Sequence, residues 1–344
     1  MKIYLRLIIP IFGILFSSCQ TLLLYEFQGL NAPNVIVPSD VKTMAFVDRN
    51  LSFKSDTMSQ YYLVNDVVVK DTMNYSAITS YNCYKGFSEN LSEYFAMDSL
   101  TYIQLSENEM AGNRKYTPMP WEQVDSICSS TGSDVVVCLE DILLYSKYTV
   151  FEDILHYGIT DVNYLAVWRI YDPLTKTYLD EKLLIDSVYS EVSSTSYKEL
   201  VDNTLPKRKD VFTDVSYEIG NQYAISLAPE WIDLSRFLFS SGDDRLSISQ
   251  YYLDQNNWET PINLWTEMTS EKNLKLAARA CYNLAVAYEI KDDFVQANKW
   301  LQESIKNYYS LTKLPAEYEK IEKYSLELQV RTKNKEKLDL FFGE

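Results

Sequence analysis

Candidate catalytic residues are unevenly represented in this chain. Its 344 residues contain one histidine, His156, which excludes any site built on two histidines. Carboxylates are numerous, with 48 Asp and Glu residues, and adjacent pairs such as Glu152-Asp153 could serve a hydrolase that uses two acids. The sequence does not show which acids face each other, and it contains no GxSxG nucleophile turn. These residues therefore specify no reaction.

Metal, cofactor and nucleic-acid sites find little support in the composition. A metal centre at His156 would need further nitrogen or sulfur ligands, and Asp243-Asp244 lacks the spaced oxygen ligands of a calcium loop. The nine glycines form no glycine-rich phosphate loop. A net charge of −16 disfavours contact with nucleic-acid phosphates, which bind clustered Lys and Arg. We expect no metal, no cofactor and no nucleic-acid partner.

Residues 1–18 have the layout of a secretory signal peptide. Lys2 and Arg6 supply a basic start, residues 7–16 are mostly apolar, and two serines precede Cys19. The apolar part is about 10 residues long, whereas a membrane-spanning helix needs about 20. We therefore expect an export signal rather than a transmembrane helix.

Residues 15–19, Leu-Phe-Ser-Ser-Cys, resemble a bacterial lipobox. In that family of signals the cysteine is lipidated and becomes the N-terminus, so the resemblance implies an acylated Cys19 that attaches the chain to a membrane. Acyl chains contribute roughly 0.8 kcal/mol for each buried CH₂ and can anchor a protein without a spanning helix. The non-acidic Gln20 after the cysteine resembles an outer-membrane address. Surface lipoproteins of Bacteroidota usually carry an acidic run just after the cysteine, and here the first acid is Glu26, so we expect a periplasm-facing lipoprotein. The alternative is an ordinary cleaved signal with an incidental cysteine.

Charge divides the mature chain into two regions. Residues 19–256 hold 17 Lys and Arg against 34 Asp and Glu, whereas residues 257–344 hold 13 against 14. We expect a tether over 19–34, an α+β domain over 35–240 and a helical domain over 241–344. The acidity of the first domain is typical of a solvated surface, and a surface for a basic partner is the alternative.

The α+β domain is predicted from alternating strand and helix patterns. The expected order is β-α-β-α-β-β-β-α, which indicates a mixed sheet with helices on one face. The expected strands are 43–47, 100–105, 134–145, 162–171 and 177–189, and the expected helices are 74–97, 120–132 and 206–228.

Three segments of this domain, residues 132–137, 168–173 and 223–236, resemble an uncharacterised family of Bacteroidota lipoproteins with a domain of unknown function. The same strand and helix order, over roughly residues 35 to 235, is similar to the periplasmic domain of the curli-secretion lipoprotein. These resemblances imply an envelope lipoprotein. The second also leaves open an oligomeric, secretion-associated role.

The helical domain resembles a tetratricopeptide repeat. Leu284, Ala285, Tyr288, Ala297 and Ser304 carry the spacing of small and large residues that this family uses to pack two antiparallel helices. Residues 252–265 predict a degenerate copy 36 residues earlier, and residues 317–342 predict one or two capping helices. The resemblance implies a surface that binds a protein partner. An internal prop against the first domain is the alternative.

The cysteines of the mature chain favour buried thiols over disulfides. Cys138 lies in an apolar run and Cys281 at a helix-packing position, so we expect both to be free. For Cys83 and Cys128 a disulfide remains open, because an envelope location permits one.

These observations favour a membrane-anchored, non-catalytic module for protein binding or assembly. Asn283, Tyr288 and Lys299 on the repeat helices are the predicted partner contacts. The rival function is a carboxylate-dependent hydrolase of envelope glycans, for which a deep cleft with two facing acids would be required. The sequence names neither the partner nor the oligomeric state.

Overall fold

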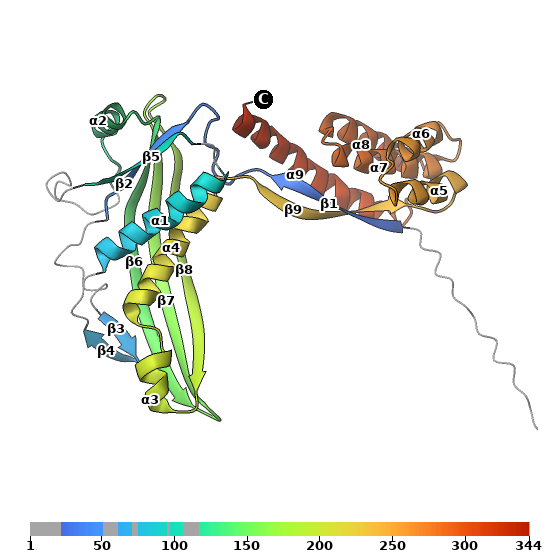
Figure 1. Cartoon of the computed structure of the whole chain (residues 1–344). Helices are drawn as coiled ribbons and strands as arrows, with labels where there is room; N and C mark the ends of the chain where they lie inside the picture. The colour runs from blue at the N-terminus through green and yellow to red at the C-terminus, as the bar shows by residue number, and fades with distance from the viewer. Residues whose placement is uncertain (1–21, 51–60, 71–74, 95–96, 106–116, 344) are drawn as a thin grey trace, which may run out of the picture. The chain divides into compact units, whose positions relative to one another are not determined.

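The structure, a computed structural model, describes residues 22–50, 61–70, 75–94, 97–105 and 117–343 (Figure 1). The predicted signal peptide and Cys19 lie outside these residues. The chain forms two compact units. The sheet unit holds Leu30–Glu230 and Asn334–Glu344, and the helical unit holds Trp231–Lys333 with the chain up to Gly29.

The sheet unit is built on a seven-stranded mixed sheet. One edge of β6 pairs in parallel with β2 and further along with β3, while its other edge pairs with β7 over its whole length. β5 pairs with β2, β4 with β3, and β8 with β7. The strands are β2 (Thr43–Asp48), β3 (Tyr61–Val64), β4 (Val67–Lys70), β5 (Ser99–Gln104), β6 (Val135–Glu152), β7 (His156–Asp172) and β8 (Thr177–Ser194).

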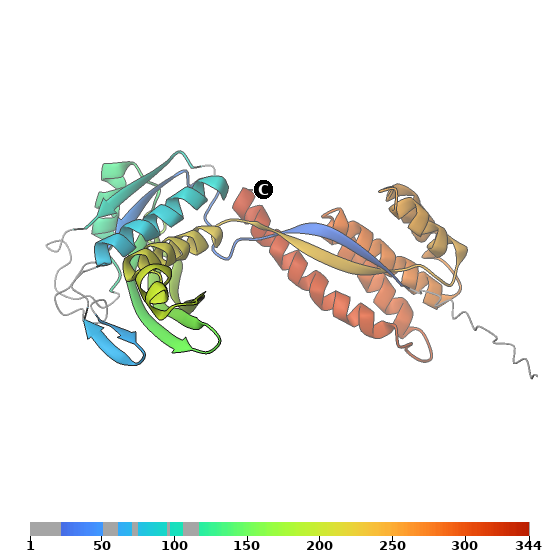
Figure 2. The ribbon, with the colours of Figure 1, turned by 60° about the horizontal axis from the view of Figure 1, so that its bottom comes forward.

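Helices cover the sheet on both faces at one end. The side chains of Met44 and Phe46 point into a core with α1 (Ser76–Tyr94) and α4 (Arg208–Ile225). The alternate residues Ala45 and Val47 point into a second core with α2 (Trp121–Thr131). Figure 2 shows α1 and α4 lying together on one face of the strands.

The predicted α+β class with a mixed sheet is therefore confirmed, but the helices do not all share one face. The crossover through α1 leads from β2 to β5, and the crossover through α2 leads back past β2 to β6. Crossovers between parallel strands are almost always right-handed, so two crossovers in opposite directions place their helices on opposite faces. This corrects the expectation for α2.

The packing of α1 on α4 depends on two glycines. A Cβ atom at Gly86 would overlap the backbone carbonyl of Tyr217, and one at Gly220 would overlap the carbonyl of Cys83. The two helix backbones can approach this closely because neither glycine has a side chain. Beneath them, the rings of Trp168 and Tyr223 stack with centroids 4.1 Å apart.

The long strands β6, β7 and β8 extend well beyond their predicted ends. The predicted ends of β6 and β8 are residues 145 and 189, whereas these strands continue to 152 and 194, and β7 begins at residue 156 rather than at 162. His156 is the first residue of β7, directly after the turn that joins it to β6, and pairs with Glu152. The sequence analysis also missed β3, β4, α3 (Tyr197–Glu199) and the π-helix η2 (Leu200–Thr204), which are short.

In the described residues the helical unit contains a two-stranded sheet and five helices. β1 lies within the predicted tether and pairs with β9, so the tether assignment of residues 19–34 is wrong over the strand. The boundary between the units lies at Glu230, ten residues before the predicted one. The elements are β1 (Leu22–Asn31), β9 (Glu230–Phe239), α5 (Asp244–Leu253), α6 (Glu259–Met268), α7 (Leu274–Ile290), α8 (Phe294–Tyr309) and α9 (Tyr318–Phe342).

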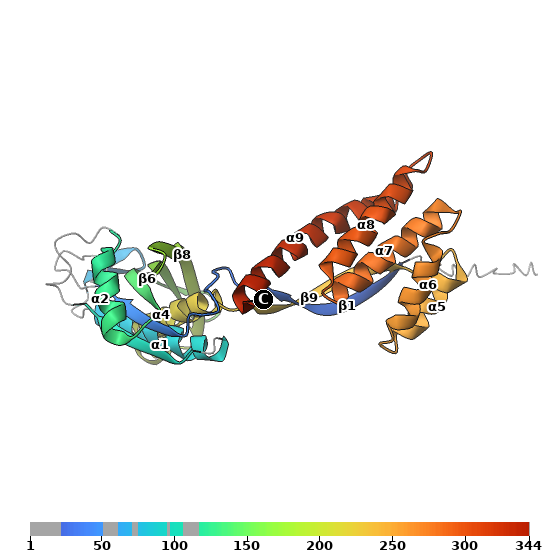
Figure 3. The same cartoon turned by 90° about the horizontal axis from the view of Figure 1, so that it is seen from above.

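Helices α7 and α8 form an antiparallel pair (Figure 3). Their small residues Ala285 and Ala297 are fully buried, and the Ser304 hydroxyl donates to the Ala278 carbonyl at 2.8 Å. The helices and their turn lie where the repeat pattern expects them, while the tetratricopeptide assignment itself stays a prediction. Among the described helices, none has the length and apolar character needed to cross a bilayer.

Replacing Gly86 by alanine should destabilise the sheet unit. The added methyl must push α1 from α4, and such overpacking costs about 1–3 kcal/mol, more than the roughly 1 kcal/mol that alanine adds through helix propensity. Asp214→Ala, at an exposed position of α4, is the control and should change the free energy of unfolding by less than about 0.5 kcal/mol. Urea unfolding measures both, and a Gly86→Ala chain as stable as the parent would contradict the close approach.

Candidate functional site

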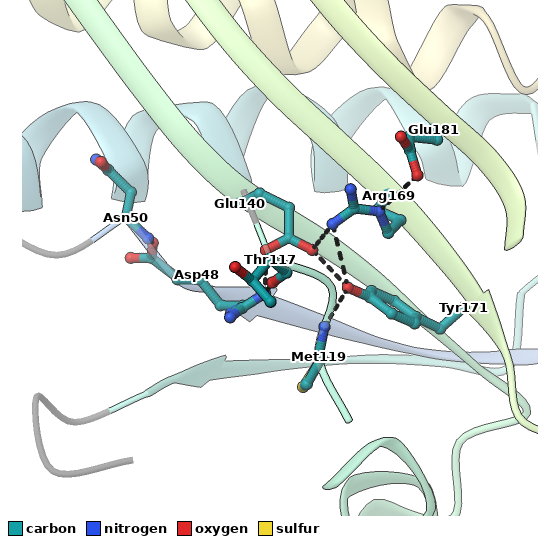
Figure 4. Close-up of polar contacts among 9 residues, drawn as sticks. Asp48, Asn50, Thr117, Met119, Glu140, Arg169, Tyr171 and Glu181 are labelled. Carbon is teal, nitrogen blue, oxygen red and sulfur yellow. Dashed lines mark hydrogen bonds and ion pairs between the residues drawn. The ribbon is translucent and has the colours of Figure 1, made fainter. Parts of the chain in front are cut away.

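A buried cluster of charged side chains lies on the α2 face of the sheet, where β2 ends beside β6 and β7 (Figure 4). Its members, called here the charge cluster, are Arg49, Glu140, Arg169, Tyr171 and Glu181. Glu140 accepts hydrogen bonds from Arg169 at 2.7 Å and from the Tyr171 hydroxyl at 2.5 Å. Its other oxygen pairs with Arg49. Arg169 also donates to Glu181 at 3.1 Å.

Strand register brings these residues together. Arg169 pairs opposite Cys138 across β6 and β7, and Tyr171 pairs opposite Val136, so their side chains point to the same face. The register shifts between Leu139 and Asp141, which makes Glu140 the extra residue of a β-bulge. A β-bulge changes the direction in which a side chain points. Here the carboxylate of the bulged residue Glu140 points toward Arg49 and Arg169.

The charge cluster also holds the segment that leads into α2. The Tyr171 hydroxyl accepts the backbone N–H of Met119 at 2.8 Å, and Arg49 donates to the Thr117 carbonyl at 3.0 Å. The backbone N–H of Arg49 donates to the Leu139 carbonyl at 3.0 Å. One set of side chains thus fixes the end of β2, the bulge of β6 and the approach to α2.

In the charge cluster, each group whose pKa is shifted keeps one protonation state at neutral pH. Burial opposes the charge of Arg49 and Arg169, but their hydrogen bonds and negative neighbours, Glu140 among them, raise the pKa of both guanidinium groups. Burial and the nearby Glu140 carboxylate raise the pKa of the Tyr171 phenol. A general acid or base works best with a pKa near the operating pH. The charge cluster is therefore suited to holding structure rather than to proton transfer.

A second buried carboxyl, Asp48, lies at the end of β2 on the opposite face. It accepts hydrogen bonds from the Tyr102 hydroxyl at 3.0 Å and from the Asn50 backbone at 2.9 Å. The Asn50 side chain donates to Ser80 of α1 at 2.8 Å. Burial raises the pKa of Asp48, yet these contacts join β2 to β5 and α1. Its role is again to connect elements.

The described cysteines are free and buried, as predicted for Cys138 and Cys281. Cys83 and Cys128, for which a disulfide was left open, are free and buried as well. Burial raises the pKa of Cys128 to about 11 and that of Cys281 to about 12. A nucleophilic cysteine reacts as its thiolate, so these thiols are unsuited to that chemistry at neutral pH.

The outer half of β6, β7 and β8 carries an apolar face that no described helix covers. Beyond the bulge, alternate residues of β6 and β7 are buried toward α1 and α4, and the residues between them are partly exposed. On β8 the side chains of Leu183, Ile185 and Tyr189 are 57%, 69% and 69% exposed. The apolar side chains of this surface, called here the open face, are Leu143, Tyr145, Phe151, Tyr157, Ile159, Leu165, Leu183, Ile185 and Tyr189. The polar residues Lys147, Thr149, Asp161, Asn163, Ser187 and Glu191 lie between them.

The helical unit carries a pocket of about 490 Å³ against β1 and β9. Two acids, Glu26 and Asp233, line it, and Gln28 donates to Asp233 at 3.2 Å. Both acids are exposed. In glycosidases the carboxyl that acts as the acid is typically held in apolar surroundings, so this pocket matches the hydrolase rival poorly.

The three predicted partner contacts differ in how far they are buried in the structure. Asn283 is fully buried and binds both the backbone N–H and the carbonyl of Phe239 at 2.8 Å, so its prediction as a contact is corrected. A buried polar side chain needs such partners, which is why a conspicuous asparagine in a helix can be structural. Tyr288 is partly buried and Lys299 is exposed beside Trp300. Cys19 lies outside the described residues.

Replacing Glu140 by glutamine should destabilise the sheet unit by about 3–5 kcal/mol, because two buried guanidinium groups would lose their shared carboxylate. Glu181→Gln is the matched control. Its side chain is 57% exposed, so its loss should cost no more than about 1 kcal/mol. Urea unfolding of the two variants measures the difference, and equal costs would contradict the central place of Glu140.

Family models match most of the chain. Residues 247–330 match a Domain of unknown function, DUF6340, and residues 41–239 match another, DUF8603. The predicted resemblance to a family of unknown function is confirmed in that respect, whereas the Bacteroidota source stays a prediction. None of the curated proteins is significantly similar in sequence.

Solved structures show distant likenesses. The PelC dodecamer from Paraburkholderia phytofirmans is 7% identical, with a TM-score of 0.22 over 60% of this chain and 99% of that one. A Xanthomonas campestris protein of the family DUF330 is 10% identical, with a TM-score of 0.27 over 57% and 94%. A minor lipoprotein from Acinetobacter baumannii is 9% identical, with a TM-score of 0.25 over 55% and 93%. We draw no functional argument from TM-scores this low. The DUF8603 match spans more than half of the 344 residues, and the chain therefore belongs to that family.

Proposed function

We propose that this protein is a lipid-anchored envelope lipoprotein whose sheet unit binds a protein partner through the open face, without catalysis. The observation that carries the proposal is the open face itself. It presents aliphatic and aromatic side chains on three long strands, and no described helix packs on it.

The composition of the open face favours a protein partner. Exposed apolar patches on soluble domains often mark protein interfaces, and interface centres are rich in aromatic residues. Phe151 and Tyr157 stack here with centroids 5.3 Å apart, and Tyr145 and Tyr189 add two more rings. Such rings bury a large area with little loss of side-chain freedom. Strands rather than loops carry them, so the surface is already formed before a partner arrives.

Charged side chains lie among the apolar residues of the open face. Lys147 pairs with Asp66 at 2.9 Å and lies opposite Asp161 in the ladder of β6 and β7. Such charges contribute to the choice of partner and to the association rate more than to affinity. The rival hydrolase would use Glu26 and Asp233 of the pocket, whose exposure supports it less well.

The membrane attachment rests on the lipobox at residues 15–19. Cys19→Ala should move the protein from the membrane fraction to the soluble fraction, because the acyl chains would be absent. Immunoblots of fractionated cells would show the shift, with Cys128→Ala as the control that keeps the anchor. A Cys19→Ala chain that fractionates like the parent, or an intact mass that retains Met1, would exclude lipidation.

The partner surface can be tested with a photocrosslinking amino acid, p-benzoylphenylalanine, in place of a tyrosine. At Tyr145 on the open face we expect one adduct of discrete mass in intact cells. At Tyr81, which is 55% exposed on α1, we expect none. Adding Leu165→Asp beside Tyr145 should reduce the adduct at least tenfold, because a carboxylate would be buried in the interface.

Two outcomes of this experiment would contradict the proposal. Equal adducts at Tyr145 and Tyr81 would indicate random encounter in the envelope. An adduct at Tyr145 with twice the mass of the chain would replace the separate partner by a second copy on the open face.

A further inference from the structure

The edge of β8 is long and unpaired in the described part of the chain. β8 runs from Thr177 to Ser194 and pairs only with β7, so its other edge faces solvent. Residues 185–191 are all exposed, on both faces of the strand. The backbone groups along this edge can pair with another strand, which at Ser187 would replace the hydrogen bond from the backbone N–H to the Asp186 carboxylate at 2.8 Å.

Few of the devices that protect an edge strand occur on β8. Natural edges are usually short, interrupted by proline or bulges, or guarded by lysines. The register of β8 with β7 is regular from Asp180 to Ser194, and the bulge lies outside that segment. This segment contains no proline, and its charged side chains are Lys182 and the four acids Asp180, Glu181, Asp186 and Glu191. A long, regular edge with exposed Ile185 and Tyr189 is the kind that pairs with another strand.

Residues 180–194 can pair antiparallel with a second copy of themselves, centred on one residue. A twofold axis perpendicular to the sheet pairs two antiparallel copies so that residue numbers opposite each other sum to a constant. The midpoint of Asp180 to Ser194 is Ser187. About this centre the facing pairs are Ser187 with Ser187, Ile185 with Tyr189, Asp186 with Val188, Leu183 with Glu191, Lys182 with Val192 and Asp180 with Ser194.

This register avoids like charges in facing positions and sets Asp186, Glu191 and Lys182 each opposite an aliphatic residue. No two acids stand opposite each other, although like charges opposed across strands would be destabilising. The two most exposed apolar side chains of β8, Ile185 and Tyr189, meet across the axis, and the aliphatic and aromatic pair is a favourable one. The small Ser187 lies on the axis, where two copies of one side chain must share space.

We propose that two copies of this protein pair through β8, antiparallel and centred on Ser187, and so join their sheets into one. The occupant of the edge is a second copy of this chain because this register pairs Ile185 with Tyr189, places the small Ser187 on the axis and sets no two acids opposite each other. Joined in this way, the open faces of the two copies would continue across the junction. The dimer uses the backbone edge of β8, whereas a separate partner would bind the open face, which shares Ile185 and Tyr189 with that edge.

Cysteine substitutions on β8 test the pairing and its register. Paired antiparallel residues have Cα atoms about 4.5–5.5 Å apart, within the range that a disulfide spans. Ser187→Cys should therefore give a disulfide-linked dimer in intact envelopes after mild oxidation. Ser193→Cys is the matched control, because six residues from the axis at about 3.3 Å each place the two thiols about 40 Å apart. Both serines are exposed, and the described native cysteines are buried.

The parent chain, with no added cysteine, controls for linkage through an unmodified Cys19. Crosslinking of Ser187→Cys at least tenfold above Ser193→Cys supports the proposal. Equal crosslinking of the two variants, or none in either, would overturn it.

A second measurement distinguishes a stable dimer from monomers that a disulfide has trapped during rare collisions. The mature full-length chain in detergent should sediment with the mass of two protein chains. The double variant Ile185→Lys and Tyr189→Lys should sediment as one chain, because the two lysines would face each other across the axis. The same pair of lysines should abolish the Ser187→Cys crosslink. A parent chain that sediments as a monomer would overturn the proposal, even if the photocrosslink at Tyr145 identifies a separate partner.

Discussion

The sheet unit depends on the pairing of β6 with neighbours on both of its edges. Over residues 135–139 β6 lies between β2 and β7, and helices bury both of its faces. Beyond the bulge at Glu140 only the α1 and α4 face is buried. One strand thus passes from a fully buried core to a surface that is open on one side, and the candidate functional surfaces lie along that second half.

The charge cluster stands where this change occurs. Glu140 occupies the bulge, and its carboxylate neutralises Arg49 from the end of β2 and Arg169 from β7. The cluster therefore joins the parallel part of the sheet to the long antiparallel strands. Buried ion pairs contribute little net stability compared with apolar packing, but the loss of one partner is costly. On this view the charge cluster specifies the register of β6 with β7. That register determines which side chains lie on the open face and along the β8 edge.

The helical unit shows how a conspicuous residue can be structural. Asn283 lies on α7 and binds the backbone of Phe239 in β9, so it attaches the helix pair to the strand. Arg236 of β9 similarly pairs with the buried Glu289 of α7 at 2.7 Å. Both contacts join residues more than 40 positions apart, and no local pattern announces them. The exposed Lys299 and the partly buried Tyr288 remain predicted contacts of the repeat helices.

The sequence by itself determined the α+β order, the helices α1, α2 and α4, and the helix pair α7 and α8, because apolar periodicity and turn residues are local signals. Tertiary structure decided where β1 pairs, since its partner β9 lies about 200 residues away. It also decided the length of β6, because residues 146–152 continue the strand by pairing with β7 and, in part, with β3. The charge cluster, the open face and the β8 edge arise only when strands are aligned. Register fixes which side chains share a face, and the sequence of one strand does not contain the register of its neighbour.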